Sequence, residues 1–127
     1  MPSNNKATIL IVDDEPQNID VLTGVLRKDY KVKAALNGEI AIHIANSAKK
    51  PDLILLDVLM PGIDGYEVCK QLKENVETAN IPIIFVTAKS EVKDEEFGFT
   101  LGAVDYITKP ISPPLVLARV KTQLALY

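Results

Sequence analysis

Runs of consecutive apolar residues alternate along the chain with longer segments in which apolar residues recur every three or four positions. The first pattern is typical of buried β-strands and the second of amphipathic helices. The pattern predicts strands near 7–12, 30–35, 53–57, 82–87 and 104–107. It predicts helices near 16–28, 38–49, 65–75, 91–101 and 113–126. Such alternation is typical of βαβ units, in which helices cover both faces of a parallel sheet.

The predicted strands differ in the charge that they carry. "ILIV", "LILL" and "IIFV" are continuously apolar, as expected of central strands buried on both faces. The second strand contains Lys31 and Lys33, and the fifth contains Asp105, which is typical of sheet edges because charge discourages pairing between sheets. With right-handed crossovers, the simplest strand order is 2-1-3-4-5. We therefore predict an α/β, doubly wound (βα)5 domain with a five-stranded parallel sheet in the flavodoxin-like order.

Proline, glycine and serine residues mark the ends of several predicted helices. Pro16 and Pro113 suit a first helical turn, where the missing N–H group would have had no partner. Gly102 suits the residue that follows a helix. Ser112 is expected to cap the last helix with its side chain.

Composition narrows the class of protein. A chain of 127 residues with 47% hydrophobic and 24% charged residues is typical of one globular domain. The net charge of −3, without a cluster of Lys or Arg, argues against a nucleic-acid surface. No apolar run is long enough to span a bilayer, and "MPSNNK" lacks the apolar core of a signal peptide. We expect one cytoplasmic domain over residues 1–127, with a polar N-terminal tail at 1–6 and no membrane partner.

Cysteine and histidine each occur once, so no intrachain disulfide is possible. Cys69 falls in a predicted helix, and we expect a reduced, partly buried thiol. His43 falls in the second predicted helix, where we expect a surface residue. That helix also carries Ile40, Ile42 and Ile44, more than one apolar stripe needs. The excess is either slack in the amphipathic pattern or a patch that faces a partner.

Two of the apolar strands lead directly into carboxylates. Asp13 and Asp14 follow the first strand, and Asp57 ends the third. In the predicted sheet the chain order reverses between these two strands, and ligands bind beyond the strand ends at that point. Two like charges ~4 Å apart repel by about 4 kcal/mol at an effective dielectric constant of 20, which favours a bound proton or cation. Oxygen ligands in this small number favour Mg²⁺.

Two further polar side chains are expected at the same edge of the sheet. Thr87 ends the fourth strand, and Lys109 follows the fifth. A nucleophilic carboxylate, a divalent cation, a hydroxyl donor and a fixed ammonium are the groups that transfer a phosphoryl group to an aspartate. In this interpretation Lys109 and the metal balance the phosphoryl charge, and Thr87 donates a hydrogen bond to a phosphoryl oxygen.

Each of these residues also has a simpler interpretation. Asp13 and Asp14 suit the start of a helix, where carboxylates are favourable, although capping does not account for Asp57. Lys109 alone reads as a solvated lysine, and Thr87 as a β-branched strand residue.

Four segments resemble the motifs of one known family. They read "VDDEP", "LLDVLMPGIDG", "VTA" and "GAVDYITKP", in the order and spacing of a response-regulator receiver domain. The resemblance extends over essentially the whole chain. Each segment alone is a weak signal, whereas the four together are highly specific to this family of two-component signalling proteins.

The resemblance assigns a role to each candidate site residue. It implies that Asp57 is the phosphoacceptor and that Asp14 ligates Mg²⁺ directly, with Asp13 assisting. It implies that the carbonyl oxygen of Leu59 completes the metal ligands from the protein. Lys109 matches the phosphate-binding lysine of the family.

The resemblance also implies a switch. Thr87 matches the switch hydroxyl and Tyr106 the aromatic switch position, although a half-buried tyrosine is common at a sheet edge. The family further implies a cis bond between Lys109 and Pro110. Our hypothesis is that Thr87 moves toward the phosphoryl group and that Tyr106 turns inward into the vacated space. The face formed by the fourth helix, fifth strand and fifth helix then changes shape.

The partners implied by the resemblance are signalling proteins. A sensor histidine kinase or phosphotransfer protein supplies the phosphoryl group, and the chain is a switch, not an enzyme, because it catalyses only its own phosphorylation and dephosphorylation. The switching face controls an output domain or a partner, or it forms a homodimer. Leu59 is bulky and lies beside the acceptor, and Lys89 lies two residues after Thr87; we predict slow self-hydrolysis.

The segment from Gly98 onward resembles receivers that precede cyclic-dinucleotide enzymes, particularly phosphodiesterases of the HD-GYP class. The helix at 113–127 ends on an apolar run without a cap, which suggests a chain cut at a domain boundary or a helix that continues into a linker. The resemblance implies that an output domain of phosphodiesterase or cyclase type follows. None of the motifs of such an enzyme is present in the chain.

Three other functions remain open at this point. One is a receiver fold that acts as a constitutive interaction module without phosphorylation. Another is a haloacid-dehalogenase phosphatase, which needs a second aspartate two residues after the nucleophile, where this chain has Leu59. The third is a flavin module, which needs a phosphate loop in place of "DDEP".

Overall fold

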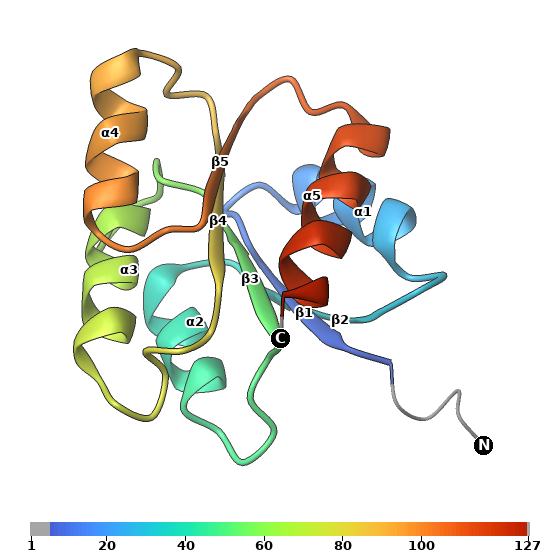
Figure 1. The fold of residues 1–127 in the computed structure, drawn as a ribbon, viewed down its shortest axis with the longest axis horizontal. Helices are drawn as coiled ribbons and strands as arrows, with labels where there is room; N and C mark the ends of the chain where they lie inside the picture. Colours follow the sequence, from blue (N-terminus) through green and yellow to red (C-terminus); the bar gives the residue numbers. More distant parts are fainter. Residues whose placement is uncertain (1–5, 127) are drawn as a thin grey trace.

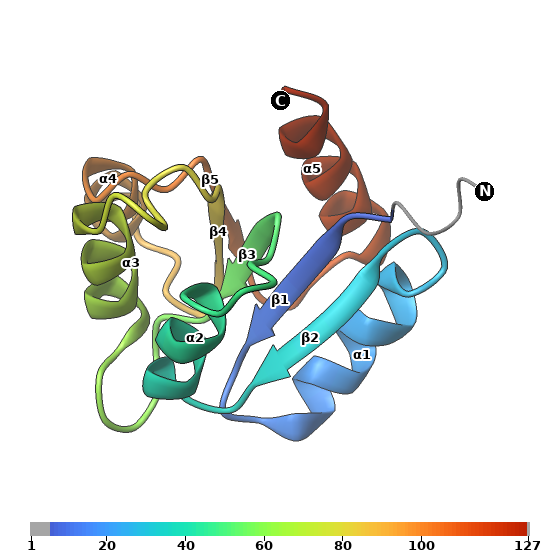
Figure 2. The same ribbon diagram turned by 90° about the horizontal axis from the view of Figure 1, so that it is seen from below.

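The apolar runs of the sequence form one parallel sheet in a computed structural model that describes residues 6–126. The strands are β1 (Thr8–Val12), β2 (Lys31–Ala35), β3 (Leu53–Leu56), β4 (Ile83–Thr87) and β5 (Asp105–Thr108). Their order is β2-β1-β3-β4-β5, and Figure 2 shows β1 between β2 and β3. The predicted doubly wound fold and strand order are therefore confirmed. Except for Lys6, the predicted polar tail lies outside the described residues.

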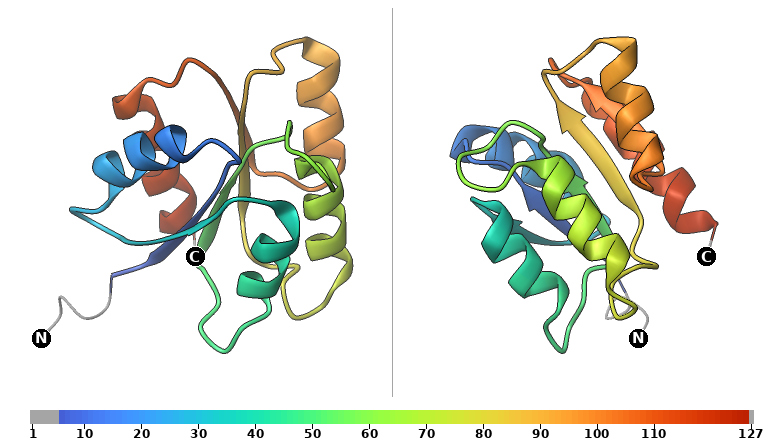
Figure 3. Two further views of the ribbon diagram at one scale, coloured as in Figure 1. Left: turned by 180° about the vertical axis from the view of Figure 1, so that it is seen from behind. Right: turned by 90° about the vertical axis from the view of Figure 1, so that its left-hand side faces the viewer.

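Five helices alternate with the strands and cover both faces of the sheet. They are α1 (Pro16–Leu26), α2 (Gly38–Ala45), α3 (Gly65–Glu74), α4 (Val92–Thr100) and α5 (Pro113–Ala125). Helices α1 and α5 lie on one face, and α2, α3 and α4 lie on the other (Figure 1). Figure 3 shows α3 between α2 and α4. None of the helices formed by the described residues has the length and hydrophobicity to traverse a bilayer.

The two faces of the sheet contribute to two separate cores, because successive residues of a strand point to opposite faces. In β1, Ile9 and Ile11 pack with the apolar residues of α1 and α5. Leu10 and Val12 pack with those of α2 and α3. All four side chains are buried. The central strands are therefore held from both sides, which fixes the positions of the residues that follow them.

Two expectations about helix ends were wrong. The second helix ends at Ala45, before residue 49, because the side chain of Asn46 donates to the carbonyl of Ile42 and that of Ser47 donates to Ile44. Such bonds compete with the next helical turn. Ser112 stands at the N-cap of α5, but its side chain makes no capping bond. Gly102 follows α4 with φ +106°, a backbone conformation that favours glycine.

The single cysteine and histidine lie where structural residues are expected. Cys69 is fully buried in the core between α3 and the sheet. Burial raises the pKa of its thiol to about 11, so the group stays protonated. His43 is exposed on α2. On the same helix Ile42 and Ile44 pack partly against the core, whereas Ile40 is 45% exposed.

Candidate functional site

Asp13 and Asp57 lie side by side because β1 and β3 are neighbours in the sheet. Val12 is paired with Leu56, and each of these residues directly precedes one of the carboxylates. The backbone N–H of Asp57 donates to the carbonyl of Val12 at 2.9 Å, which extends the pairing by one residue. Both side chains are buried, with relative exposures of 2% for Asp13 and 5% for Asp57. Carboxylate oxygens of Asp13, Asp14 and Asp57 lie within 4.8 Å of one another.

Lys109 brings a positive charge to this carboxylate pair. Its Nζ donates to Asp13 Oδ2 at 2.8 Å and to Asp57 Oδ2 at 3.1 Å. The lysine follows β5, and its backbone N–H donates to the carbonyl of Thr87 at the end of β4. The peptide bond between Lys109 and Pro110 is cis, as the resemblance implied. One ammonium group is therefore shared between two buried carboxylates.

The charge balance at this site is reflected in two pKa values. Burial raises the pKa of Asp57 above the ordinary carboxyl value; Lys109 opposes this shift, and the charge of Asp13 adds to it. Burial alone would lower the pKa of Lys109, but its bonds to the two carboxylates raise it instead. Lys109 is thus held in its charged form, whereas Asp57 loses its proton less readily than a solvated carboxyl group does.

Backbone N–H groups orient both carboxylates. Asp13 Oδ1 accepts from the N–H of Glu15 at 3.0 Å, and Asp57 Oδ1 accepts from the N–H of Leu59 at 3.3 Å. The N-cap residue of α1 is Glu15, and no side chain caps this helix. Neither Asp13 nor Asp14 is therefore the N-cap residue of α1, although Asp13 accepts from the N–H of the residue that is. Asp14 is more exposed than the other two carboxylates.

Gly65 allows the acceptor loop to close, a role that sequence reasoning missed. A Cβ atom at this position would overlap the backbone carbonyl oxygen of Asp57. The N–H of Gly65 donates to the carbonyl of Val58 at 2.9 Å, and Asp64 caps α3 through the N–H of Glu67. The start of α3 is thus anchored directly against the backbone of the candidate acceptor. The glycine that opens a helix after a capping aspartate is the signal that could have shown this.

Thr87 and Tyr106 lie on adjacent strands, where Thr87 is paired with Thr108 and Tyr106 with Phe85. Thr87 is the last residue of β4 and is buried, and its Oγ1 accepts from the N–H of Lys89 at 3.4 Å. Tyr106 is only 8% exposed, and its hydroxyl lies 3.3 Å from that of Tyr66 on α3. The expected half-buried tyrosine is therefore a buried one. Its ring already points inward, so an inward turn from this arrangement is not available to it.

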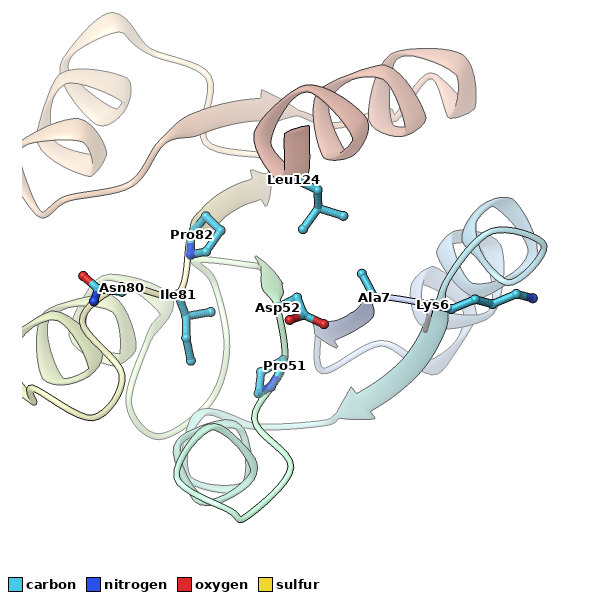
Figure 4. Close-up of a pocket in the computed structure, with 8 residues that line it drawn as sticks. All are labelled: Lys6, Ala7, Pro51, Asp52, Asn80, Ile81, Pro82 and Leu124. Carbon is cyan, nitrogen blue, oxygen red and sulfur yellow. The ribbon is translucent and has the colours of Figure 1, made fainter. Parts of the chain in front are cut away.

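A pocket at the opposite end of the sheet has a different character. It has a volume of about 460 Å³ and lies where the strands begin, beside the end of α5 (Figure 4). Its charged lining residues are Lys6 and Asp52, and Asp52 already accepts from the backbone N–H of Thr8 at 2.7 Å. This pocket contains no cluster of acidic or nucleophilic groups. The carboxylates of Asp13, Asp14 and Asp57 and the ammonium of Lys109 are grouped at the other end of the sheet, where the strands finish.

The acidic residues fit a hard divalent cation. Carboxylate oxygens are ligands that Mg²⁺ prefers, and Mg²⁺ keeps several waters when few protein ligands are present. Asp13, Asp14 and Asp57 offer one oxygen each within reach of a single ion. The backbone of Leu59 is adjacent to the Asp57 carboxylate. Positive charge at this point would relieve the cost of ionised Asp57.

Comparisons with known proteins agree with this geometry. Residues 9–121 match the model of a family described as the response regulator receiver domain. The chain is 50% identical over 125 residues to a probable cyclic di-GMP phosphodiesterase of Vibrio cholerae, covering 98% of this chain and 28% of that protein. It is 40% identical to protein PilH of Pseudomonas aeruginosa, covering 94% of this chain and 98% of PilH.

A solved structure shows the same fold. The beryllofluoride-activated receiver domain of DrrB from Thermotoga maritima superimposes with a TM-score of 0.84 at 33% identity, covering 94% of this chain and 98% of that one. The chain therefore spans nearly all of some relatives and about a quarter of the Vibrio cholerae protein.

Proposed function

Because the chain belongs to the response regulator receiver domain family, we propose that it accepts a phosphoryl group on Asp57 and acts as a signalling switch. Receiver domains are signalling switches, not classical enzymes, and their partners are histidine kinases. One observation carries the proposal: the ammonium of Lys109 contacts both Asp13 and Asp57, at 2.8 Å and 3.1 Å. This contact fixes a cation beside the candidate nucleophile.

The proposed reaction is an in-line displacement at phosphorus. A carboxylate oxygen of Asp57 forms a bond to the phosphorus of a phosphohistidine or small phosphodonor. The bond from phosphorus to the leaving group breaks, and its electron pair leaves with that group. The product is an acyl phosphate on Asp57. Lys109 stabilises the phosphoryl oxygens, and the Thr87 hydroxyl donates to one of them.

In this proposal Asp14 and Asp57 hold Mg²⁺, with Asp13 assisting and the carbonyl oxygen of Leu59 as a further ligand. When bound, the ion supplies positive charge that neutralises the donor and orients it for transfer. Among the residues of the chain, Lys109 keeps Asp57 and Asp13 together in spite of their repulsion. The N–H of Leu59 holds one oxygen of Asp57, and this contact orients the carboxylate.

The proposal is tested by incubation with acetyl phosphate and Mg²⁺, followed by measurement of the intact mass. We expect the wild type to gain one phosphoryl group, and the gain to vanish with excess EDTA. The variant Asp57→Ala should not gain mass. As a matched control, Asp20→Asn removes an exposed carboxylate of α1 and should behave as the wild type. A wild type that gains no mass would favour a constitutive interaction module instead.

We further propose that the switching face comprises α4, β5 and α5. Exposed apolar residues lie on its two helices: Val92 and Phe99 on α4 and Leu115 on α5. Arg119 of α5 contacts Asp105 of β5 at 3.5 Å across this face. Apolar surface of this kind suits a homodimer or an output domain. Sedimentation with and without beryllofluoride tests the dimer, because the phosphoryl mimic should shift the mass toward two copies.

The output proposed for this chain is control of a cyclic-dinucleotide phosphodiesterase or cyclase. The proposal rests on the likeness to the Vibrio cholerae protein over 98% of this chain. In it, residues 1–127 are one receiver domain, and α5 leads toward the output domain. The DNA that follows the codon for residue 127 tests it: an open frame that encodes such an enzyme would support the assignment, and a stop codon would contradict it.

A further inference from the structure

Four aromatic rings form a run of contacts across α3, α4 and the sheet. Tyr66 comes from α3, Phe85 from β4, Phe97 from α4 and Tyr106 from β5. The ring of Tyr66 meets Phe85 edge-on at a centroid distance of 5.3 Å and Phe97 at 4.8 Å. The rings of Phe85 and Tyr106 are 5.8 Å apart. Tyr66 is thus the ring that bridges the sheet and α4, and Figure 3 shows α3 directly beside α4.

The hydroxyl group of Tyr66 has two partners in different elements. It lies 3.2 Å from the backbone carbonyl oxygen of Asp94, in the first turn of α4. It also lies 3.3 Å from the hydroxyl of Tyr106. A carbonyl oxygen only accepts, so the single proton of Tyr66 goes to Asp94. The hydroxyl of Tyr106 must then donate to the oxygen of Tyr66, so the hydrogen bonds run from Tyr106 through Tyr66 to Asp94.

The same turn of α4 is connected to the candidate phosphorylation site. The carboxylate of Asp94 contacts the ammonium of Lys89 at 3.7 Å. The backbone N–H of Lys89 donates to the hydroxyl oxygen of Thr87 at 3.4 Å. A movement of Thr87 therefore acts on the loop that carries Lys89, and through it on the start of α4. The hydrogen bond from Tyr66 also ends on Asp94, so Tyr66 and Lys89 contact the same residue of α4.

Helix α4 also lies unusually close to the rings. A Cβ atom at Gly98 would lie 3.1 Å from ring carbons of both Phe85 and Tyr106. No side chain separates the helix from the ring of Tyr106. A shift of α4 and a change in the orientation of Tyr106 therefore affect each other through direct contact.

We propose that Tyr66 is the positioning residue that couples the inward orientation of Tyr106 to the placement of α4. Its hydroxyl group bonds to Tyr106 and to α4 at the same time, so removing this group should free the ring of Tyr106 and the start of α4 together. As a device for switching, this coupling rests on the proposed function of Asp57. As an arrangement of the free protein, it is independent of phosphorylation.

The test compares Tyr66→Phe with the wild type by NMR of ¹³C-labelled tyrosine rings and by amide hydrogen exchange. Phenylalanine keeps the ring contacts and removes only the hydroxyl. We expect the Tyr106 ring to become accessible to a soluble paramagnetic agent. We also expect amides in the first turn of α4 to exchange about fivefold faster, the effect of one ordinary hydrogen bond.

Two further variants test the direction of the hydrogen bonds from Tyr106 through Tyr66 to Asp94. Tyr106→Phe should leave exchange in α4 near the wild-type rate, because the bond from Tyr66 to Asp94 remains. The double variant should match Tyr66→Phe. As a control, Tyr30→Phe removes a hydroxyl on the opposite side of the sheet and should change neither readout. The coupling is overturned if Tyr66→Phe leaves both readouts unchanged, or if it changes only one of them.

Phosphorylation by acetyl phosphate is measured on the same samples by intact mass. Tyr66→Phe should gain the phosphoryl group to the wild-type extent, because the residue does not touch Asp57. In the phosphorylated wild type, the exchange rates of the α4 amides and the accessibility of the Tyr106 ring should change together. In phosphorylated Tyr66→Phe, one of them should change without the other. A wild type without mass gain would refute the proposed function, whereas ring exposure and amide exchange would still decide the coupling.

Discussion

One oxygen of Asp57 faces the ammonium of Lys109, and the other faces the backbone N–H of Leu59. The adjacent carboxylate of Asp13 shares the same ammonium. Burial of two carboxylates beside one ammonium leaves the negative charge only partly compensated. The ionised acceptor therefore has an electrostatic cost, and a bound cation or a phosphoryl group with its metal would reduce that cost.

The first prediction concerns the free energy of unfolding of Asp57→Asn in the presence of EDTA. The pKa of Asp57 is raised in the folded state, mainly by burial, so the stability that its neutral form confers is lost as pH rises through that pKa. The asparagine variant should therefore be more stable than the wild type at pH 7. The difference should shrink as pH falls through the raised pKa toward the ordinary carboxyl value.

Thermal melts of both proteins between pH 4 and pH 8 would measure this. Asp20→Asn is the control, because this exposed carboxylate should give no such trend. An asparagine variant that is less stable than the wild type at pH 7 would show that ionised Asp57 is not under strain from its surroundings.

A second prediction concerns the lifetime of the acyl phosphate. The side chain of Leu59 is 54% exposed, and its backbone contacts the Asp57 carboxylate. A bulky apolar side chain at this place shields the path of an attacking water. Leu59→Asn should shorten the lifetime several-fold, measured as the decay of the phosphorylated mass after the donor is removed. An unaltered decay rate would remove Leu59 from this role.

At the scale of the element, α4 depends on a glycine for its position. Gly98→Ala should destabilise the protein by about 1 to 2 kcal/mol, because overpacking outweighs the better helix propensity of alanine. Gly24 is the matched control in α1, where a Cβ atom would have no neighbour within 4 Å. Gly24→Ala should stabilise the protein by about 0.5 to 1 kcal/mol. Denaturant unfolding measures both, and equal signs for the two variants would contradict the close packing of α4.

The elements were largely predictable because each follows from a local pattern. Continuous apolar runs became β1, β3 and β4, and the lysines of β2 and Asp105 of β5 marked the sheet edges. The end of α2 was less predictable, since it depends on whether Asn46 and Ser47 bond to the backbone instead of continuing the helix. Propensity and periodicity do not decide that competition.

At the scale of the whole molecule, the residues that the sequence could place together are those that follow strands. The ends of parallel strands meet at one edge, so the proximity of Asp13, Asp57 and Lys109 follows from topology. The roles of Gly65 and Tyr66 were not predictable in this way. They depend on the distance between α3 and the acceptor loop and on the packing of α3 against α4, which no local pattern encodes.

A fourth prediction concerns the stability of the whole domain in Mg²⁺. A ligand that binds only the folded state stabilises it by about 2.7 kcal/mol at one hundred times its dissociation constant. Titration with Mg²⁺ should therefore raise the melting temperature of the wild type. Asp57→Asn should show little of this increase, and Asp20→Asn all of it. A wild type that melts at the same temperature with Mg²⁺ and with EDTA would contradict a cation site among the three carboxylates.

The most direct test of the account locates the phosphoryl group itself. Borohydride reduces an aspartyl phosphate to homoserine, and peptide mass spectrometry then identifies the position that was modified. After incubation with acetyl phosphate and Mg²⁺, we predict homoserine at position 57 and at no other aspartate. Homoserine at position 13 or 14, or none at all in a sample that carries phosphate, would contradict Asp57 as the acceptor.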